Sequence, residues 1–273
     1  MIIANWKCNT MGHWEQKEWL SDFKHLCSHG HHAHKGKIGC YVGVAPPAIY
    51  ISDFLLNPDS YELDNSHRDL LSQLRIGIQD VDHSSGSRTG AISVEMLENK
   101  NLDFAIIGHS ERREIFNEDN DLIKEKLKSI INYKYGKINR VMAVLCIGET
   151  KEENDKGITK DILKDQLEIL NGIELDESNI FNFTVAYEPV WAIGSGLTPE
   201  PKDINEIHKY IKDVVQSYSA NNLIPTVLYG GSVTDKNAES LFVEEFVDGA
   251  LVGGASLDGS TFAKIVNIFN STK

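Results

Sequence analysis

Short apolar runs alternate with longer segments of helical periodicity along the whole 273-residue chain. Eight runs of β-branched or aliphatic residues predict strands near residues 2–4, 40–44, 76–79, 104–108, 141–147, 183–187, 226–229 and 250–252. Between the runs, apolar residues recur every three or four positions, most clearly over residues 203–218, where Ile204, Ile211 and Val215 share one helical face. Strands that are apolar throughout are typical of a parallel sheet covered by helices.

Such a sheet can stay open and doubly wound, or it can close into an eight-stranded barrel. No GxGxxG motif follows the first run, and no Pro/Gly/Ser-rich linker divides the chain. Barrels of this class use about 250 residues as one domain. We therefore predict an α/β fold, a single (β/α)8 barrel over residues 1–273.

The composition limits which classes of binding partner and which cellular compartment fit this chain. The chain has 27 basic and 40 acidic residues, a net charge of −13, which disfavours nucleic acid and anionic membranes as partners. The longest strongly apolar stretch, 141–148, is far shorter than the roughly 20 residues of a membrane span, and the N-terminus lacks the pattern of a signal peptide. The cysteines have no CxxC spacing and are expected as free thiols: Cys8, Cys27, Cys40 and Cys146. We expect a cytoplasmic protein.

Two segments stand apart from this regular pattern. A polar stretch over residues 57–73 is rich in Asn, Asp and Ser, and no function is predicted for it. The histidine-rich turn contains His29, His31, His32 and His34, a density that can bind a transition metal. Because no carboxylate or cysteine frames these histidines as a site, we interpret the turn as a solvated loop and predict no metal.

The predicted ends of the strands are unusually polar or rich in glycine. In a parallel barrel, function gathers at the carboxyl ends of the strands, so these segments are the candidate site. They are Asn5-Trp6-Lys7, Gln79-Asp80, 108–113, 146–149, 187–196, 229–232 and 251–255.

Glu188 ends the sixth predicted strand, and Pro189 favours an extended backbone before it. A carboxylate that faces an apolar cavity is less favoured in its charged form, which suits a general base, although a Glu-Pro pair alone is also typical of a surface strand end. The next segment combines the bulk of Trp191 with the backbone freedom of Gly194 and Gly196. That combination suits a flap that closes over a ligand and excludes water; a static glycine turn is the alternative.

His109 follows the fourth predicted strand and precedes a short helix expected to begin near Ser110. A helix N-terminus disfavours the imidazolium, so the ring is expected to be neutral and able to donate a hydrogen bond to a carbonyl. The next charged residues, Glu111, Arg112 and Arg113, are also typical of a solvated surface, and we expect Arg113 there.

Lys7 and Asn5 would place a cation and a hydrogen-bond donor at the end of the first strand, although three residues alone also fit an ordinary surface. The last two strands end in Gly230-Gly231-Ser232 and Gly253-Gly254. Glycine pairs let backbone N–H groups approach a phosphate, and a helix expected after Gly254 would add its dipole. Two tight turns are the alternative interpretation.

Together these segments resemble the triosephosphate isomerase family over essentially the whole chain. The matching motifs are Asn5-Trp6-Lys7, 108–113, 146–150, 186–194, 229–233 and 251–257. The resemblance implies a TIM barrel that interconverts dihydroxyacetone phosphate and D-glyceraldehyde 3-phosphate through an enediolate. It places the reaction in glycolysis and gluconeogenesis and implies no metal or organic cofactor.

The resemblance also implies the roles of individual residues. Glu188 would be the base and a neutral His109 the group that polarises the carbonyl, a pairing for which this family is itself the standard example. Asn5 would assist His109, and Lys7 would stabilise the developing negative charge. Residues implied in substrate and phosphate binding are Asn5, Lys7, Gly194, Ser232, Gly253 and Gly254. The implied flap consists of Pro189, Val190, Trp191, Ala192, Ile193, Gly194, Ser195, Gly196, Leu197 and Thr198.

Members of the family are homodimers through a loop after the third strand, here residues 79–91. Thr89, followed by Gly90, matches the residue that reaches the neighbouring active site. Two departures lie in this loop, Asp80 where Asn is usual and Ala91 where Glu is usual, so they concern the interface more than the fold. The other departures are Cys8 for Met, Ser195 for Thr and Leu197 for Lys.

Two other functions are compatible with parts of this pattern. A different phosphate-sugar barrel enzyme, such as a pentose-phosphate epimerase or an indole-forming synthase, would need a paired-Asp or Lys set at other strand ends, and the flap motif argues against it. A non-catalytic phosphate-binding or interaction protein is disfavoured by the presence of Asn5, Lys7, His109 and Glu188. The net charge of −13 repels a negatively charged phosphate substrate. An enzyme that acts on a sugar phosphate therefore needs a local positive pocket to attract it.

Overall fold

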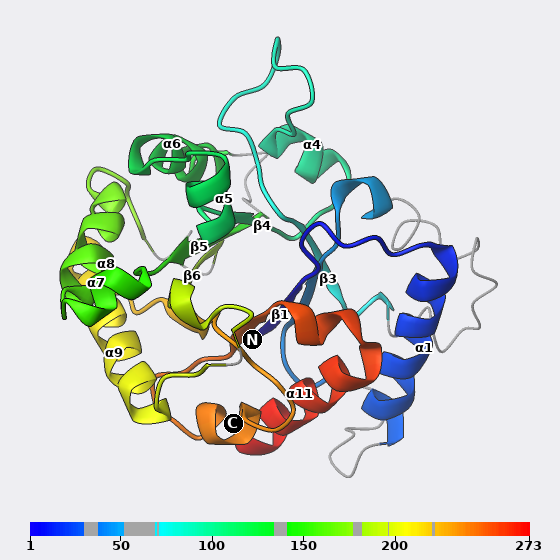
Figure 1. Ribbon diagram of the computed structural model, residues 1–273. Helices are drawn as coiled ribbons and strands as arrows, with labels where there is room; N and C mark the ends of the chain where they lie inside the picture. Colours follow the sequence, from blue (N-terminus) through cyan, green and yellow to red (C-terminus); the bar gives the residue numbers. More distant parts are fainter. Residues whose placement is uncertain are drawn as a thin grey trace.

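The computed structural model describes residues 1–29, 38–51, 69, 71–133, 141–176, 182–195, 197–219 and 222–273. These residues form a closed barrel of parallel strands in chain order, with helices around the outside (Figure 1). The predicted single TIM barrel is therefore confirmed. Among the described residues, no helix is long and apolar enough to span a bilayer.

Each strand pairs in parallel with its neighbour along the chain, and the first pairs with the last to close the barrel. The strands are β1 (Ile2–Asn5), β2 (Val42–Ala45), β3 (Arg75–Ile78), β4 (Phe104–Ile107), β5 (Met142–Ile147), β6 (Phe183–Tyr187), β7 (Thr226–Tyr229) and β8 (Ala250–Val252). All eight predicted strands are present, with boundaries within two residues of those expected from the apolar runs.

Helices occupy the segments between the strands. The α-helices are α1 (His13–His29), α4 (Val94–Asn99), α5 (Ser110–Ile115), α6 (Asn120–Ile131), α7 (Lys151–Asp155), α8 (Thr159–Leu167), α9 (Pro201–Tyr218), α10 (Ala238–Phe242) and α11 (Gly259–Thr272). Short 3-10 helices are η1 (Ala48–Tyr50), η3 (Glu168–Leu170), η5 (Val190–Ala192) and η6 (Gly254–Leu257). The first and last long helices, α1 and α11, pack together and join the two ends of the chain.

The inside of the barrel is filled by its own layer of side chains, separate from the layer between strands and helices. Phe104 is the largest side chain of the inner layer and is fully buried. Its ring occupies space that two neighbouring strands leave free, because a Cβ on Gly43 would lie 2.8 Å from the ring and one on Gly77 would overlap it. The absence of side chains at Gly43 in β2 and Gly77 in β3 thus leaves the space that the ring of Phe104 fills.

The helical faces predicted from periodicity are the buried ones, and they also include polar side chains. In α9, His208 is fully buried beside the expected Ile204, Ile211 and Val215. In α6, Lys126 is 3% exposed. Periodicity predicted neither side chain in the core, because it counts only apolar residues.

The segment between β3 and α4 extends outward from the barrel, at the top of Figure 1. Residues 84–90 of this segment, which include Thr89 and Gly90, are exposed. Three predictions fall on residues outside the described ranges: the histidines of the turn after His29, most of the 57–73 stretch, and Gly196 of the flap.

Candidate active site

The strand ends surround a cavity of about 420 Å³ at the carboxyl edge of the barrel. Parallel strands in a closed barrel present their carboxyl ends on the same side, which brings together residues that are far apart in the chain. The lining includes every residue singled out for catalysis or substrate binding: Asn5, Lys7, His109, Glu188, Gly194, Ser232, Gly253 and Gly254. The volume is within the range of small-molecule sites.

Glu188 is 2% exposed and lies directly after β6, where its N–H donates to the carbonyl of Ile147 at 2.7 Å. Its Oε1 is 3.2 Å from His109 Nε2, and its Oε2 accepts the N–H of Ser110 at 3.1 Å. A Cβ on Gly230 would lie 2.7 Å from Glu188 Cγ. This glycine, interpreted from sequence as an approach for phosphate, therefore leaves space for the carboxylate side chain.

His109 caps the N-terminus of α5, as the sequence predicted. Its Nδ1 accepts the backbone N–H of Glu111 at 3.2 Å. A ring nitrogen that accepts this hydrogen bond has no proton of its own, so the proton of a neutral ring is on Nε2. The geometry thus assigns His109 as a neutral imidazole whose Nε2–H points toward Glu188.

Lys7 adopts a left-handed backbone conformation with φ +49°, which costs a non-glycine residue roughly 1–3 kcal/mol and persists only where its surroundings fix it. Three neighbours do so. The N–H of Lys7 donates to Asn5 Oδ1 at 3.0 Å, and its carbonyl accepts Gln79 Nε2 at 2.9 Å. Its Nζ is 2.6 Å from Glu111 Oε1. No role for Gln79 or Glu111 is predicted from the sequence, although both lie at strand ends.

The beginning of the flap, residues 189–198, is attached to the scaffold through Glu149. Trp191 Nε1 donates to Glu149 Oε1 at 2.9 Å, and the hydroxyl of Tyr187 donates to the same oxygen at 3.3 Å. Glu149 is fully buried, and this burial raises the pKa of its carboxyl group. The sequence placed Glu149 among the strand ends without giving it a function.

Further contacts join the flap to the segment after β7. Ser232 Oγ donates to the carbonyl of Ala192 at 2.6 Å. Asn237 Nδ2 bonds to both the carbonyl of Ser232 at 2.9 Å and Thr198 Oγ1 at 3.4 Å. The flap, with Gly194 at φ +65°, therefore lies against the cavity and is held at both ends.

One expectation about this region is wrong. Arg113 is not a solvated surface residue, because its guanidinium donates to the carbonyl of Gly108 at 2.8 Å and to Asn120 Oδ1 at 2.8 Å, and burial lowers its pKa. The charge run looked solvated because sequence does not show that the turn folds back onto the strand ends. The helix expected after Gly254 is present as the short 3-10 helix η6, which begins at Gly254 itself, and the α-helix α11 starts at Gly259.

A second cavity of about 550 Å³ lies on another side of Glu188, with Ser110, Arg113 and Trp191 among its lining residues. Glu188 is therefore shared between the walls of the two cavities. Nearby, Cys146 is 1% exposed, and burial raises the pKa of its thiol far above the usual value. Within the described ranges, no group of three His, Cys, Asp or Glu side chains could hold a metal ion.

Comparison with known proteins gives a consistent result. The family model described as triosephosphate isomerase matches residues 1–269. A triosephosphate isomerase of Escherichia coli O1:K1 / APEC is 36% identical, with 100% of this chain and 98% of that protein covered. That of Sodalis glossinidius is 36% identical over 97% of this chain and 95% of its own length. That of Alkaliphilus metalliredigens is 40% identical over 72% of this chain and 77% of its own length.

Proposed function

Since the chain belongs to the triosephosphate isomerase family and interconverts D-glyceraldehyde 3-phosphate and dihydroxyacetone phosphate, we propose that Glu188 and His109 perform the proton transfers of this isomerisation. The observation that supports this assignment is their direct contact, 3.2 Å between Glu188 Oε1 and His109 Nε2, in the cavity at the strand ends. The two groups differ as the reaction requires, since one is a carboxylate and the other a neutral hydrogen-bond donor.

Glu188 removes a proton from the carbon beside the substrate carbonyl and returns it to the neighbouring carbon. This residue is 2% exposed and forms part of the cavity wall, so the carboxylate is held beside the place where substrate binds. Substrate replaces His109 as the neighbour of Oε1, while the N–H of Ser110 remains a donor for Oε2.

His109 donates its Nε2 proton toward the carbonyl oxygen and exchanges protons between the two oxygens of the enediolate. The backbone N–H of Glu111 keeps Nδ1 as an acceptor, so the ring keeps the same tautomer when substrate replaces Glu188 beside Nε2. Asn5, in the same cavity wall, assists as a hydrogen-bond donor to these oxygens.

Lys7 supplies the positive charge at the site. Its Nζ is paired with Glu111, and the side chain of Lys7 is 24% exposed, so it can approach a bound anion. The backbone N–H groups of Gly194, Ser232, Gly253 and Gly254 bind the phosphate on the same cavity wall. Flap closure over residues 189–198 excludes water and protects the enediolate.

We propose further that the enzyme is a cytoplasmic homodimer in which the loop at residues 79–91 enters a second copy. In support, the loop extends from the barrel with Thr89 exposed, and Ile49 and Phe116 are large apolar side chains left 79% and 61% exposed. Sedimentation equilibrium tests the dimer: twice the chain mass is expected, and the mass of one chain at micromolar concentration would contradict it.

Glu188→Asp tests the assignment of the base, because it retracts the carboxylate by one methylene group and keeps its charge. The expected result in a coupled assay with D-glyceraldehyde 3-phosphate is a kcat lower by about 100-fold or more with little change in thermal stability. The matched control is Glu152→Asp, the same substitution at a side chain on α7 that is 78% exposed. We expect this control variant to have the kcat of wild type. Near-normal turnover of Glu188→Asp would refute the role.

A further inference from the structure

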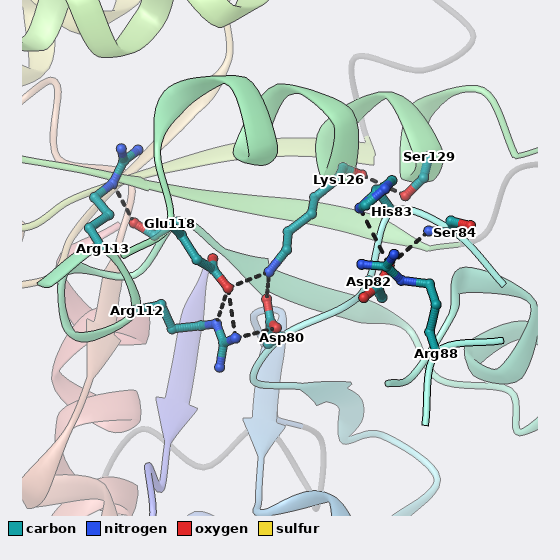
Figure 2. A network of polar contacts seen from close by, with 11 residues as sticks. Asp80, Asp82, His83, Ser84, Arg88, Arg112, Arg113, Glu118, Lys126 and Ser129 are labelled. Carbon is teal, nitrogen blue, oxygen red and sulfur yellow. Dashed lines mark hydrogen bonds and ion pairs between the residues drawn. The ribbon is translucent and has the colours of Figure 1, made fainter. Parts of the chain in front are cut away.

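Four charged side chains beside the active site form a partly buried charge cluster, shown in Figure 2: Asp80, Arg112, Glu118 and Lys126. Asp80 follows β3 by two residues, Arg112 lies on α5, Glu118 precedes α6 and Lys126 lies on α6. Lys126 Nζ is 2.7 Å from Asp80 Oδ1 and 2.6 Å from Glu118 Oε1. Arg112 Nη2 is 2.9 Å from Asp80 Oδ2 and 2.6 Å from Glu118 Oε1. The cluster therefore joins three segments of the chain.

The charges in this cluster balance. Two cations face two carboxylates, and Lys126 and Glu118 are only 3% and 5% exposed. Asp80 uses each of its oxygens for a different cation, Oδ1 for Lys126 and Oδ2 for Arg112. A carboxylate is required for this double contact, since an amide of the same shape has one oxygen and would turn an N–H donor toward a cation. Removal of one partner would leave an uncompensated charge in a buried place.

The two segments that Asp80 and Arg112 connect are the ones that hold Lys7. Gln79, immediately before Asp80, donates its Nε2 to the carbonyl of Lys7 and also to that of Ala45, each at 2.9 Å. Glu111, immediately before Arg112, binds Lys7 Nζ at 2.6 Å. The Asp80–Arg112 contact is thus one residue away from Gln79 and from Glu111, two of the three residues that fix the strained Lys7.

We propose that Asp80 is a positioning residue for substrate binding: it locks the end of β3 to α5 and so fixes Gln79 and Glu111 around Lys7. This inference rests on the proposed role of Lys7 in binding the substrate. It gives a function to a position where this chain departs from the residue usual in the family. A displacement of reacting or binding groups by about 1 Å can cost up to about 100-fold in rate, so a loosened Lys7 has a measurable effect.

The experiment compares KM, kcat and the inhibition constant of phosphoglycolate in wild type, Asp80→Leu and Asp80→Asn. For Asp80→Leu we expect KM and the inhibition constant to rise together by about tenfold, with a smaller change in kcat, because ground-state binding is lost. For Asp80→Asn, both constants should lie between those of wild type and Asp80→Leu, because asparagine keeps one acceptor oxygen. Unchanged binding constants in a folded Asp80→Leu enzyme would overturn the proposal.

Asp82→Asn is the matched control within the same loop. The carboxylate of Asp82 is held by that loop itself, through Arg88 Nε at 2.7 Å and the N–H of Ser84 at 3.0 Å. This substitution removes the same charge from the loop without touching the Asp80–Arg112 contact, so KM should stay within about twofold of wild type. A rise equal to that of Asp80→Leu would show general loosening of the loop and contradict a specific role of Asp80.

The double variant Asp80→Leu/Lys126→Met separates positioning from stability. It removes one charge of each sign and keeps the Arg112–Glu118 pair, so thermal stability should recover while KM stays high, because α5 is still untied from β3. Recovery of both stability and KM would mean that Asp80 only balances charge, and would overturn the proposal. Lys7→Met tests the premise separately: normal phosphoglycolate binding in that variant would refute the role of Lys7 itself.

Discussion

The buried His208 predicts a specific acid sensitivity of the fold. Its ring is fully buried in α9, with Nδ1 3.3 Å from the carbonyl of Phe246 and the ring of Tyr187 5.9 Å away, edge to face. Burial lowers the pKa of His208 from 6.5 to about 3, and although the carbonyl of Phe246 opposes this shift, nearby Lys212 adds to it. The folded protein therefore resists protonation at a pH where the unfolded chain takes up a proton.

The sign and size of the effect follow from proton linkage. Stability from the neutral ring is complete above pH 6.5 and is lost progressively as the pH falls from 6.5 toward 3, because only the unfolded state gains a proton over that range. Between about pH 8 and about pH 5 the loss from this one group is about 2 kcal/mol, and near pH 3 it reaches about 4 kcal/mol.

The assay is urea unfolding at fixed protein concentration between about pH 5 and about pH 8, for wild type, His208→Gln and His25→Gln. Glutamine keeps an N–H donor for the carbonyl of Phe246 but does not titrate, so its curve should fall by about 2 kcal/mol less than that of wild type. The exposed His25 is the control, and its variant should follow wild type. Parallel curves for wild type and His208→Gln would refute the reasoning.

Three further predictions concern the core, a helix end and the chemistry. Gly77→Ala, which drives a Cβ into the ring of Phe104, should lower the free energy of unfolding by about 1–3 kcal/mol in urea; an unchanged value would mean that the barrel interior can expand. Asp119→Ala removes the cap of α6, where Oδ1 accepts the N–H of Leu122 at 2.9 Å, and should cost about 1 kcal/mol, with equal midpoints counting against it. His109→Gln should lower kcat by about 100-fold or more at nearly constant thermal stability, and full activity would remove His109 from the mechanism.

The sequence by itself determined the fold class and the location of the chemistry. Eight apolar runs and the helical segments between them specify a parallel barrel. The periodicity that predicts each element lies within that element's own residues, so it can be recognised without knowing which elements pack beside it. The polar strand ends then point to one edge, and the structure brings Asn5, Lys7, His109 and Glu188 together there. Even the N-terminus of α5 at His109 could be expected from the order of residues.

The tertiary structure alone decided which polar side chains are buried and with whom. Arg113 and Lys126 belong to charged segments that are typical of a surface. In the structure, Arg113 donates a hydrogen bond to the carbonyl of Gly108 at a strand end, and Lys126 is buried in an ion pair with Asp80. From the sequence, Gly230 is typical of a phosphate-binding loop. In the structure, its missing side chain leaves room for Glu188. Burial and pairing of charges depend on contacts between residues distant in the chain, and periodicity contains no information about those contacts.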